Sequence, residues 1–324
     1  MGALLERCRS ALRWRAPGDR GFILIVVISA IGILALVAAS FAQITSSHVR
    51  AATSAVQSAG AEALADAGVQ LAILDLVAAR SGNGPPRQRF TTDGVAQTCD
   101  AGDGNWLAIA VQDEAGKVDV NVADERLIRA LLRGLGVASS ATVADALLDF
   151  RDADDNRRPQ GAERAEYLAA GRAHGPKNAP LSVVDELEQV LGLSAADAAR
   201  LRPHVTVYSG QSGIAPSAAS PTLLSLLSRG LAPAEPAESS APKEDVEPDD
   251  GPRQLPREFG GGAGGRVFSV RSEGHAGRAI FVREAIVEVA SSRAKPFVLH
   301  RWHRGSMGHG APLRSGGEAV LPRC

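Results

Sequence analysis

The stretch GFILIVVISAIGILALVAASF, from Gly21 to Phe41, decides how this 324-residue chain is organised. It contains no charged residue, and the next full charge downstream is Arg50. At about 1.5 Å of rise per residue, roughly twenty apolar residues in a helix span the ~30 Å hydrocarbon core of a bilayer. The stretch therefore predicts a membrane-spanning helix over residues 22–41.

The residues before this stretch are predominantly basic. Two acidic residues, Glu6 and Asp19, stand against the arginines Arg7, Arg9, Arg13, Arg15 and Arg20. An excess of Lys and Arg marks the side of a membrane helix that stays in the cytoplasm. We therefore expect a single-pass protein with a cytoplasmic N-terminus and an exported C-terminal body.

Three interpretations of this segment are open. A cleaved secretory signal peptide has a shorter apolar core and a small-residue cleavage site, for which Ala38-Ala39-Ser40 is the candidate here. An uncleaved signal anchor would need no processing site at all. The third interpretation rests on the junction itself, where the basic leader ends in Arg20-Gly21 and Phe22 opens the apolar run.

Composition restricts the function classes. The formal net charge is −1, so no overall basic field points to nucleic acid. Aromatic residues make up 4% of the chain, and this favours helices packed through small side chains over an aromatic-rich β-sandwich. The length is enough for one large or two medium domains.

The three cysteines fall in different parts of the chain. Cys8 lies in the leader, whereas Cys99 and Cys324 would both reach an oxidising compartment in which a disulfide is permitted. Their spacing alone leaves open whether they pair.

The apolar helix is expected to continue beyond the membrane to about residue 80, because residues 51–79 are rich in helix formers and no proline occurs before Pro85. Small and apolar residues recur at three- and four-residue spacing and predict its buried stripe, namely Val56, Gly60, Ala63, Ala67, Leu71 and Leu74. Turn-favouring residues at 81–86 end the helix.

The first part of a β region is expected over 81–120, with a hairpin made by Trp106–Val111 and Val118–Val120. A helical insertion follows over 121–229. Its expected helices are Leu127–Leu135, Val143–Phe150, Val183–Leu191, Ser194–Leu201 and Pro221–Leu227.

The sequence after the insertion changes character twice. Residues 230–265 are rich in Pro, Glu and Gly and are expected to be a disordered linker. The remaining strands are expected over 266–304, as a hairpin of Val267–Arg271 with Ala279–Val289 and an edge strand at Phe297–Trp302. A flexible tail is expected over 305–324. The fold class is therefore α+β, a long N-terminal helix on a small antiparallel sheet with a large all-α, helix-hairpin-helix or SAM-like insertion.

Several motifs together resemble the general secretion pathway protein K family, the minor pseudopilins of type II secretion systems. Beside the Gly21–Phe22 junction, the residues that carry the resemblance are KVDVNVADE (117–125), LDFRDADD (148–155), GAE (161–163), Tyr167, GPKN (175–178), SVVDEL (182–187) and FVREA (281–285). Together these motifs are specific, and they extend over nearly the whole chain.

The resemblance implies a function and a maturation route. It implies a prepilin leader at 1–21, cut by a prepilin peptidase after Gly21, with methylation of the new N-terminal Phe22. It also implies a place in the bacterial inner membrane, at the tip of a pseudopilus that supports export of folded proteins. The implied partners are other minor pseudopilins, with the outer-membrane secretin and cargo as further contacts, and with no nucleic acid or small-molecule substrate.

One departure from most pilins agrees with this family. The fifth mature position usually carries Glu, whereas here it is Val26. A carboxylate in hydrocarbon is costly unless it is paired, and in filaments it meets the N-terminal amine of a neighbour. A subunit without it cannot make that contact, and protein K typically lacks it.

An acidic cluster follows the second expected helix of the insertion. Counting Asp152 as position 1, Asp154, Asn156 and Glu163 fall at positions 3, 5 and 12 of an EF-hand loop. Arg157 replaces the glycine of position 6, so a regular EF-hand is not expected. A calcium site of another shape is, because hard oxygen ligands suit Ca²⁺ and the resemblance implies calcium in this insertion. The ligand candidates are Asp149, Asp152, Asp154, Asp155 and Glu163.

Other interpretations stay open beside this one. The nearby Arg151, Arg157 and Arg158 could neutralise the acidic loop without a metal ion. The segment Leu181–Leu193 resembles a helix-hairpin-helix module of competence-type DNA-binding proteins, although a packing role is favoured because acidic residues precede it. A calcium-dependent hydrolase is the third alternative, but the chain has no G-x-S-x-G, H-E-x-x-H or C-x-x-C motif, and we expect no enzyme.

Overall fold

The computed structural model describes residues 19–81, 90–232, 256, 259–262, 264–290, 292, 294–306 and 322–324. The chain forms two compact units that divide after Gln57. A single helix, α1 (Asp19–Ser81), runs through both, which agrees with the helix expected over 22–80. Most of the leader, residues 1–18, lies outside the described residues.

The first unit is the apolar half of α1. Its large apolar side chains are exposed along the whole segment; at its two ends Phe22 is 70% exposed and Phe41 is 71% exposed. The helix is long and apolar enough to cross a membrane. An exposed apolar surface of this extent fits a membrane anchor rather than a helix in water.

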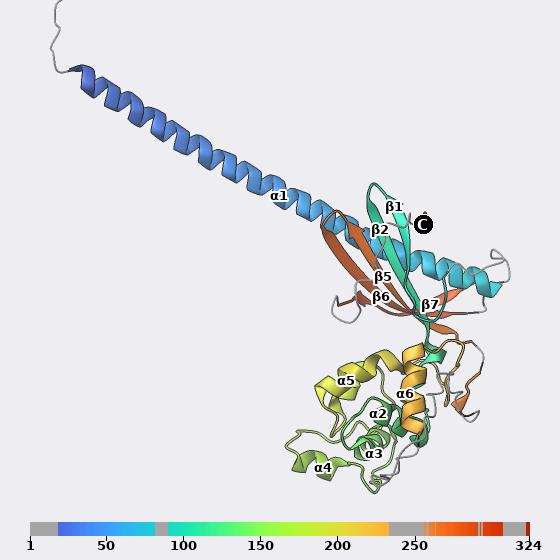
Figure 1. Ribbon diagram of the computed structural model, residues 1–324. Coiled ribbons are helices and arrows are strands. Elements are labelled where there is room, and N and C mark those ends of the chain that lie inside the picture. The colour runs from blue at the N-terminus through green and yellow to red at the C-terminus, as the bar shows by residue number, and fades with distance from the viewer. Residues whose placement is uncertain are drawn as a thin grey trace, which may run out of the picture. The chain divides into compact units, whose positions relative to one another are not determined.

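The second unit contains a five-stranded antiparallel sheet in the order β1-β2-β5-β6-β7. In Figure 1 its strands lie against the last part of α1. The strands are β1 (Gln97–Gly102), β2 (Asn105–Asp113), β5 (Val267–Ala276), β6 (Ala279–Val289) and β7 (Phe297–Arg304). The hairpin of β5 with β6 and the edge strand β7 agree with the sequence-based expectations.

The hairpin expected between Trp106–Val111 and Val118–Val120 is wrong. Strand β2 pairs with β1 and β5 instead, and β3 (Val118–Asp119) pairs in parallel with β4 (Val205–Thr206). The physical reason is the short helix η1 (Glu114–Gly116), whose N-cap Asp113 accepts a hydrogen bond from the Ala115 N–H. This cap turns the chain out of the sheet before it can fold back.

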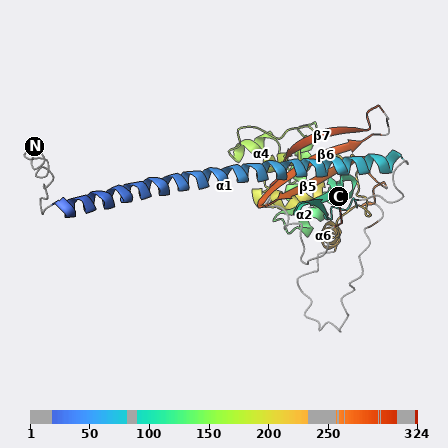
Figure 2. The same ribbon diagram turned by 90° about the horizontal axis from the view of Figure 1, so that it is seen from above.

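Small residues let α1 lie directly on β5, as both ribbon views show (Figures 1 and 2). A Cβ at Gly274 would stand 2.2 Å from the Ala61 carbonyl oxygen, and one at Gly68 would stand 2.1 Å from the Ser272 hydroxyl. The buried stripe of α1 consists of Ala61, Ala65, Val69, Ala72, Ile73 and Leu76. The stripe expected from the sequence is therefore wrong at Val56, Ala63, Ala67 and Leu74, which are exposed, whereas Gly60 is partly buried and Leu71 packs against the core.

Arg283 joins the sheet to α1 electrostatically. Its guanidinium on β6 donates to the carboxylates of Asp66 at 2.5 Å and Glu62 at 2.8 Å. The same group lies over the rings of Phe281 and Trp302. The carboxylates raise the pKa of Arg283 against the opposing effect of burial.

The helical insertion lies between β2 and β5 in the sequence and has its own core. Its elements are α2 (Glu125–Gly134), α3 (Ser140–Arg151), α4 (Arg164–Ala169), η2 (Val184–Gln189), α5 (Ala195–Leu201), η3 (Arg202–His204) and α6 (Pro221–Leu231). Asp124, Ser194 and Ser220 cap α2, α5 and α6 with side-chain hydrogen bonds. Glycine permits the close contact of α2 with α6, since a Cβ at Gly230 would stand 1.8 Å from the Ala130 carbonyl oxygen.

Two expectations for the insertion are corrected. The helix expected at Val183–Leu191 is only the 3₁₀ segment η2, and α4 was not expected. The linker expected over 230–265 is too long at its C-terminal end, because Phe259 is buried in the helical core and Gly260 bridges to Ile214. Residues 233–255 lie outside the described residues.

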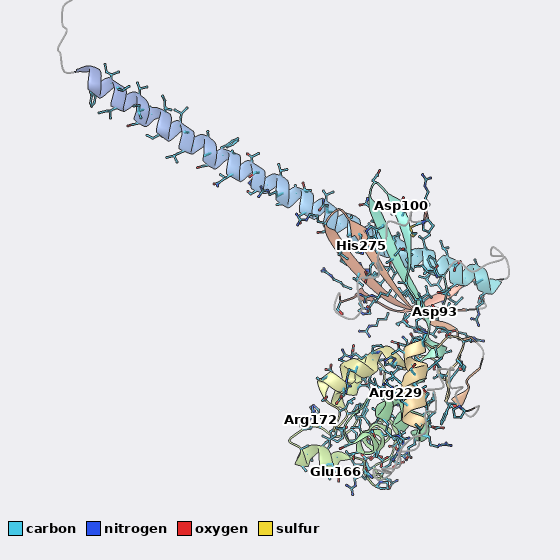
Figure 3. The ribbon with its side chains drawn as sticks, in the orientation of Figure 1. Asp93, Asp100, Glu166, Arg172, Arg229 and His275 are labelled. Atoms are coloured by element: carbon cyan, nitrogen blue, oxygen red, sulfur yellow. A yellow bond between two sulfur atoms is a disulfide. The ribbon has the colours of Figure 1, made fainter. Side chains whose placement is uncertain are left out.

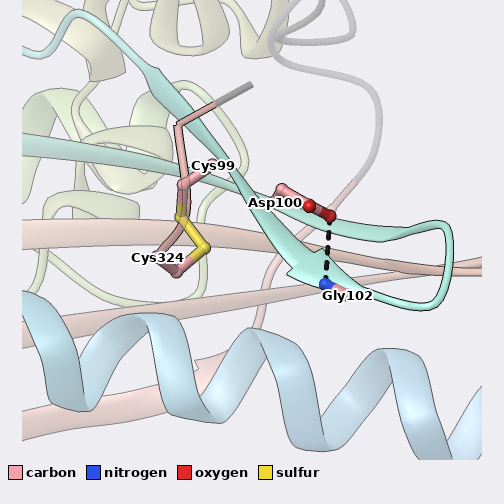
Figure 4. The surroundings of a disulfide bond; sticks show 4 residues. All are labelled: Cys99, Asp100, Gly102 and Cys324. Atoms are coloured by element: carbon pink, nitrogen blue, oxygen red, sulfur yellow. Dashed lines mark hydrogen bonds between the residues drawn. A yellow bond between two sulfur atoms is a disulfide. The ribbon is translucent and has the colours of Figure 1, made fainter. Parts of the chain in front are cut away.

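A disulfide joins Cys99 on β1 to Cys324 at the end of the chain (Figure 4). Two backbone hydrogen bonds accompany it, from Asp100 N–H to the Pro322 carbonyl and from Cys324 N–H to the Asp100 carbonyl. The tail expected to be flexible over 305–324 is therefore fixed at 322–324, while 307–321 lie outside the described residues. The structure thus contains the bridge that the spacing of the cysteines left open.

The contact of α1 with β5 can be tested with one methyl group. Gly274→Ala should destabilise the body by about 1–3 kcal/mol, because its Cβ meets helix backbone that cannot move aside. Gly60→Ala is the matched control, since its Cβ would lie at an ordinary 3.4 Å from that of Ala276 and Ala favours the helix. Chemical denaturation measures both, and equal stability of the two variants would contradict the close packing.

Candidate functional site

The acidic loop connects α3 to α4 in the helical insertion. Asp149 lies in the last turn of α3, Asp152 is the C-cap residue of that helix, and Glu163 is the N-cap residue of α4. Asp154 and Asp155 lie between them in the loop. Figure 3 labels Glu166 and Arg172 on and just beyond α4, next to this loop in the chain.

Asp149 is fully buried beneath the loop. Its carboxylate accepts a hydrogen bond from the Arg158 backbone N–H at 3.2 Å and contacts the Arg158 Nε at 3.3 Å. Gly161 leaves room for this arrangement, since a Cβ there would stand 2.0 Å from an Asp149 oxygen. Burial raises the pKa of Asp149, which shows that the contacts offset its desolvation only in part.

Glu163 is the most perturbed carboxyl group of the site. It is 6% exposed, and neither side-chain oxygen has a hydrogen-bond partner among the described residues. Burial, followed by the negative charges of the other four candidates, raises its pKa to about 7. The fold therefore brings all five predicted acidic residues within electrostatic reach of one another.

Two further buried oxygen atoms of this region have no hydrogen-bond partner among the described residues, Oδ1 of Asp152 and Oδ1 of Asn178. The Asn178 amide nitrogen donates to the Asp154 carbonyl and to the Asp155 carboxylate at 2.8 Å. Asn178 has a φ of 50°, a conformation that Asn tolerates better than most residues. Sequence reasoning did not assign Asn178 to the site, although it lies in the GPKN motif.

The arginines neutralise the loop only in part. Arg158 contacts Asp149 and, at 3.7 Å, Asp152. Arg157 pairs instead with Glu166, and Arg151 donates to the backbone carbonyls of Val120 and Ala123. The interpretation of an Arg-compensated loop therefore accounts for two of the five carboxylates and leaves Glu163 without a counter-charge.

The chemistry of these donors fits a hard cation. Ca²⁺ binds carboxylate, amide and carbonyl oxygens, and the partnerless atoms of Glu163, Asp152 and Asn178 are all of these kinds. Within the described ranges, however, no three Asp, Glu, His or Cys side chains converge closely enough to hold a metal ion. The donors are thus of the right type and in one region, without forming a finished coordination shell.

The other predicted sites stand as follows. Gly21 and Phe22 lie in the first turns of α1, and Phe22 is exposed. The Leu181–Leu193 segment lacks a first α-helix, because only η2 forms there. Its acidic residues are occupied by ion pairs, Glu186 with Lys177 at 2.7 Å and Glu188 with Arg202.

Comparison with known proteins supports the family resemblance over about a third of the chain. Residues 105–210, which contain β2, the acidic loop and η2, match the family described as type II secretion system (T2SS), protein K. The resemblance to protein K is confirmed.

A solved structure has a similar fold. A chain from the crystal structure of the GspK-GspI-GspJ complex from the enterotoxigenic Escherichia coli type 2 secretion system superposes with a TM-score of 0.53 at 17% sequence identity. The match covers 80% of this chain and 99% of that chain. A comparison with curated protein sequences found no match. The expected α+β fold, a long N-terminal helix on a small antiparallel sheet with additional helices, is therefore confirmed.

The pKa of Glu163 predicts how stability depends on pH in the absence of divalent cations. Its pKa rises from 4.5 to about 7 on folding, so between these values the folded state holds a proton that the unfolded chain has released. The free energy of unfolding should therefore fall as pH rises from 4.5 to 7. Glu163→Gln should remove this part of the fall, as measured by thermal melting at pH 5 and pH 8 in chelator.

Glu166→Gln is the matched control, because the pKa of Glu166 is lowered by its hydrogen bond from the Glu163 N–H and an amide oxygen can still accept that bond. This variant should keep the fall in stability between pH 5 and pH 8. Equal pH dependence of the Glu163→Gln variant and the unmodified protein would contradict the assignment.

Proposed function

We propose that this chain is a minor pseudopilin at the tip of a type II secretion pseudopilus, where it supports filament assembly and export of folded proteins across the outer membrane. The match of residues 105–210 to protein K carries the proposal. The exposed apolar half of α1 supports it, because such a surface can pack beside the helices of sister subunits.

Two features favour the tip. The helical insertion adds more than a hundred residues, roughly a second domain, between the sheet neighbours β2 and β5. A filament subunit covered by another copy has little room for such an addition. Val26 also lacks the carboxylate that would pair with the N-terminal amine of a neighbouring subunit.

The proposed partners are the other minor pseudopilins of the same secretion system. The similar solved structure is a complex of GspK with GspI and GspJ, and we infer that their counterparts bind this chain. The secretin and cargo are further proposed contacts. The proposed location is the bacterial inner membrane, with residues 1–20 in the cytoplasm and the body in the periplasm. The proposed work is assembly and transport, without covalent chemistry.

We also propose that the acidic loop binds calcium. Asp149, Asp152, Asp154, Asp155 and Glu163 are the proposed ligand set, to which the structure adds Asn178. A divalent cation would supply the counter-charge that Glu163 lacks and occupy the partnerless oxygens. The Glu163 pKa of about 7 supports this, because carboxylates that lie close together without a counter-charge are typical of an empty cation site.

Calcium should stabilise the body in proportion to its binding. At a free concentration 100 times the Kd, the gain is about 2.7 kcal/mol, which corresponds to a rise in Tm of roughly 5–11 °C for a body of this size. Thermal melting at pH 7.5 with calcium and with chelator measures it. Asp152→Asn should reduce the rise, whereas Asp185→Asn, an exposed acid outside the loop, should leave it unchanged; superimposable curves with and without calcium would count against the site.

Processing provides the direct test of the pseudopilin assignment. N-terminal sequencing and mass measurement of membrane-extracted protein should give a methylated Phe22 as the first residue. Gly21→Leu should block the cut and keep the leader. A mature chain that begins near Phe41, or one that retains the leader without any substitution, would exclude the proposed route.

A further inference from the structure

The two edges of the sheet differ in whether another described segment of the chain covers them. The β1 edge is covered by the chain's own C-terminus, which is hydrogen-bonded at Asp100 and fixed by the disulfide between Cys99 and Cys324. Strand β7 forms the other edge. Proteins usually cover, shorten or charge an exposed edge strand, because its free backbone groups can pair with another chain.

The hydrogen bonds at the two ends of β7 show which of its backbone groups face outward. Ala290 N–H donates to the Pro296 carbonyl at 2.9 Å, and Gly305 N–H donates to the Val282 carbonyl at 3.0 Å. Antiparallel pairing alternates inward and outward positions, with one irregularity between Ile286 and Val287. The N–H and C=O groups that face away from β6 are therefore those of Phe297, Leu299, Trp302 and Arg304. Among the described residues, no backbone hydrogen bond joins them to another segment.

The first half of this edge is apolar and exposed. Phe297 is 38% exposed, and Val298 and Leu299 are each 43% exposed. Three consecutive exposed apolar residues on a free edge lack the usual protection against pairing. Phe297 and Leu299 lie opposite the buried Val289 and Val287, so they extend the apolar surface of the sheet outward.

The second half of the edge is cationic. His300, Arg301 and His303 are paired within the body, with Glu288, Asp185 and Glu284. These pairs are partly exposed and contribute little to stability, so they can exchange partners. Arg304 lies over the Phe281 ring and has no carboxylate partner in the described part of the chain.

The charge of β7 disfavours a second copy of this chain as occupant. Full antiparallel pairing of β7 with itself would place the apolar Phe297–Leu299 segment of one copy opposite the Trp302–Arg304 segment of the other, and in-register parallel pairing would place Arg against Arg. Like charges on directly opposite residues destabilise a strand pair. The complementary occupant is an extended segment that sets apolar residues beside Phe297–Leu299 and carboxylates beside Arg301–Arg304.

We propose that β7 is a docking edge, and that an extended segment of a sister minor pseudopilin, with apolar residues beside Phe297–Leu299 and carboxylates beside Arg301 and Arg304, binds it as a sixth strand. This inference rests on the proposed function for the identity of the partner, but on β7 itself for the surface. Backbone hydrogen bonds to Phe297 and Leu299 supply the binding, and carboxylates near Arg301 and Arg304 fix the register.

Amide hydrogen exchange of the full chain in detergent, alone and in complex with the other minor pseudopilins of its secretion system, tests the edge directly. The outward-facing amides of Phe297, Leu299, Trp302 and Arg304 should exchange at least tenfold more slowly in the complex. Leu299→Lys should raise the Kd at least tenfold, because a lysine on an edge strand opposes pairing. Arg304→Glu should raise it at least threefold. Ile280→Lys is the matched control, since Ile280 is 41% exposed on β6 outside the edge. This variant should bind the sister pseudopilins with an unchanged Kd.

The outcomes separate the two proposals. A complex that forms without protection of the four outward-facing amides, or that tolerates Leu299→Lys, overturns the docking edge and leaves the pseudopilin assignment intact. Protection of these amides by concentration of this chain alone overturns the sister subunit as occupant. Failure of the unmodified protein to bind any sister pseudopilin contradicts the proposed function, and with it the proposed occupant.

Discussion

The helix-on-sheet layer of the body depends on one close contact, that of the α1 backbone with the backbone of β5. Gly274 and Gly68 hold no side chain where helix and sheet meet, and Ala61 and Ala65 fill the remaining space. Such an approach gains dispersion contacts over a long interface without large side chains. It explains how a chain with 4% aromatic residues can build a stable helix-on-sheet layer. It also makes the C-terminal part of α1, which follows the apolar half, a part of the folded body.

Two buried aspartates allow a second helical core to be inserted in this layer without disrupting it. Where the chain leaves the sheet, Asp113 accepts hydrogen bonds from the N–H groups of Ala115 and Gly265, which are far apart in sequence. Asp119 does the same for Asn121 and Gly210. Asp113 therefore joins the outgoing and returning segments at the sheet, and Asp119 joins two segments inside the insertion.

The local features of this fold could be predicted from the sequence, and the long-range ones could not. The extent of α1 followed from the absence of proline, and α2, α3, α5 and α6 followed from caps and periodicity. The strands that pair with β2 could not be predicted, because β5 is more than 150 residues away in the sequence and β1 has no apolar alternation. The buried face of α1 was missed because both of its faces carry alanine, and only the sheet decides between them.

The acidic site, too, could be predicted from the sequence only in part. The spacing of its carboxylates was visible in the sequence, and so all five candidates were named. Their differences were not visible, since the pKa of Glu163 and the full burial of Asp149 arise from the way the loop folds over the end of α3. Asn178 comes from a segment 23 residues beyond Asp155 and reaches the site only through the tertiary fold.

The central claim is that a membrane-anchored helix continuous with this body serves protein export. Deletion of the gene in its own bacterium, followed by return of the unmodified chain, measures this most directly through the amount of folded protein that reaches the medium. The account predicts that export across the outer membrane stops on deletion, with cargo retained in the periplasm, and recovers when the chain is returned. Undiminished export in the deletion strain would contradict it.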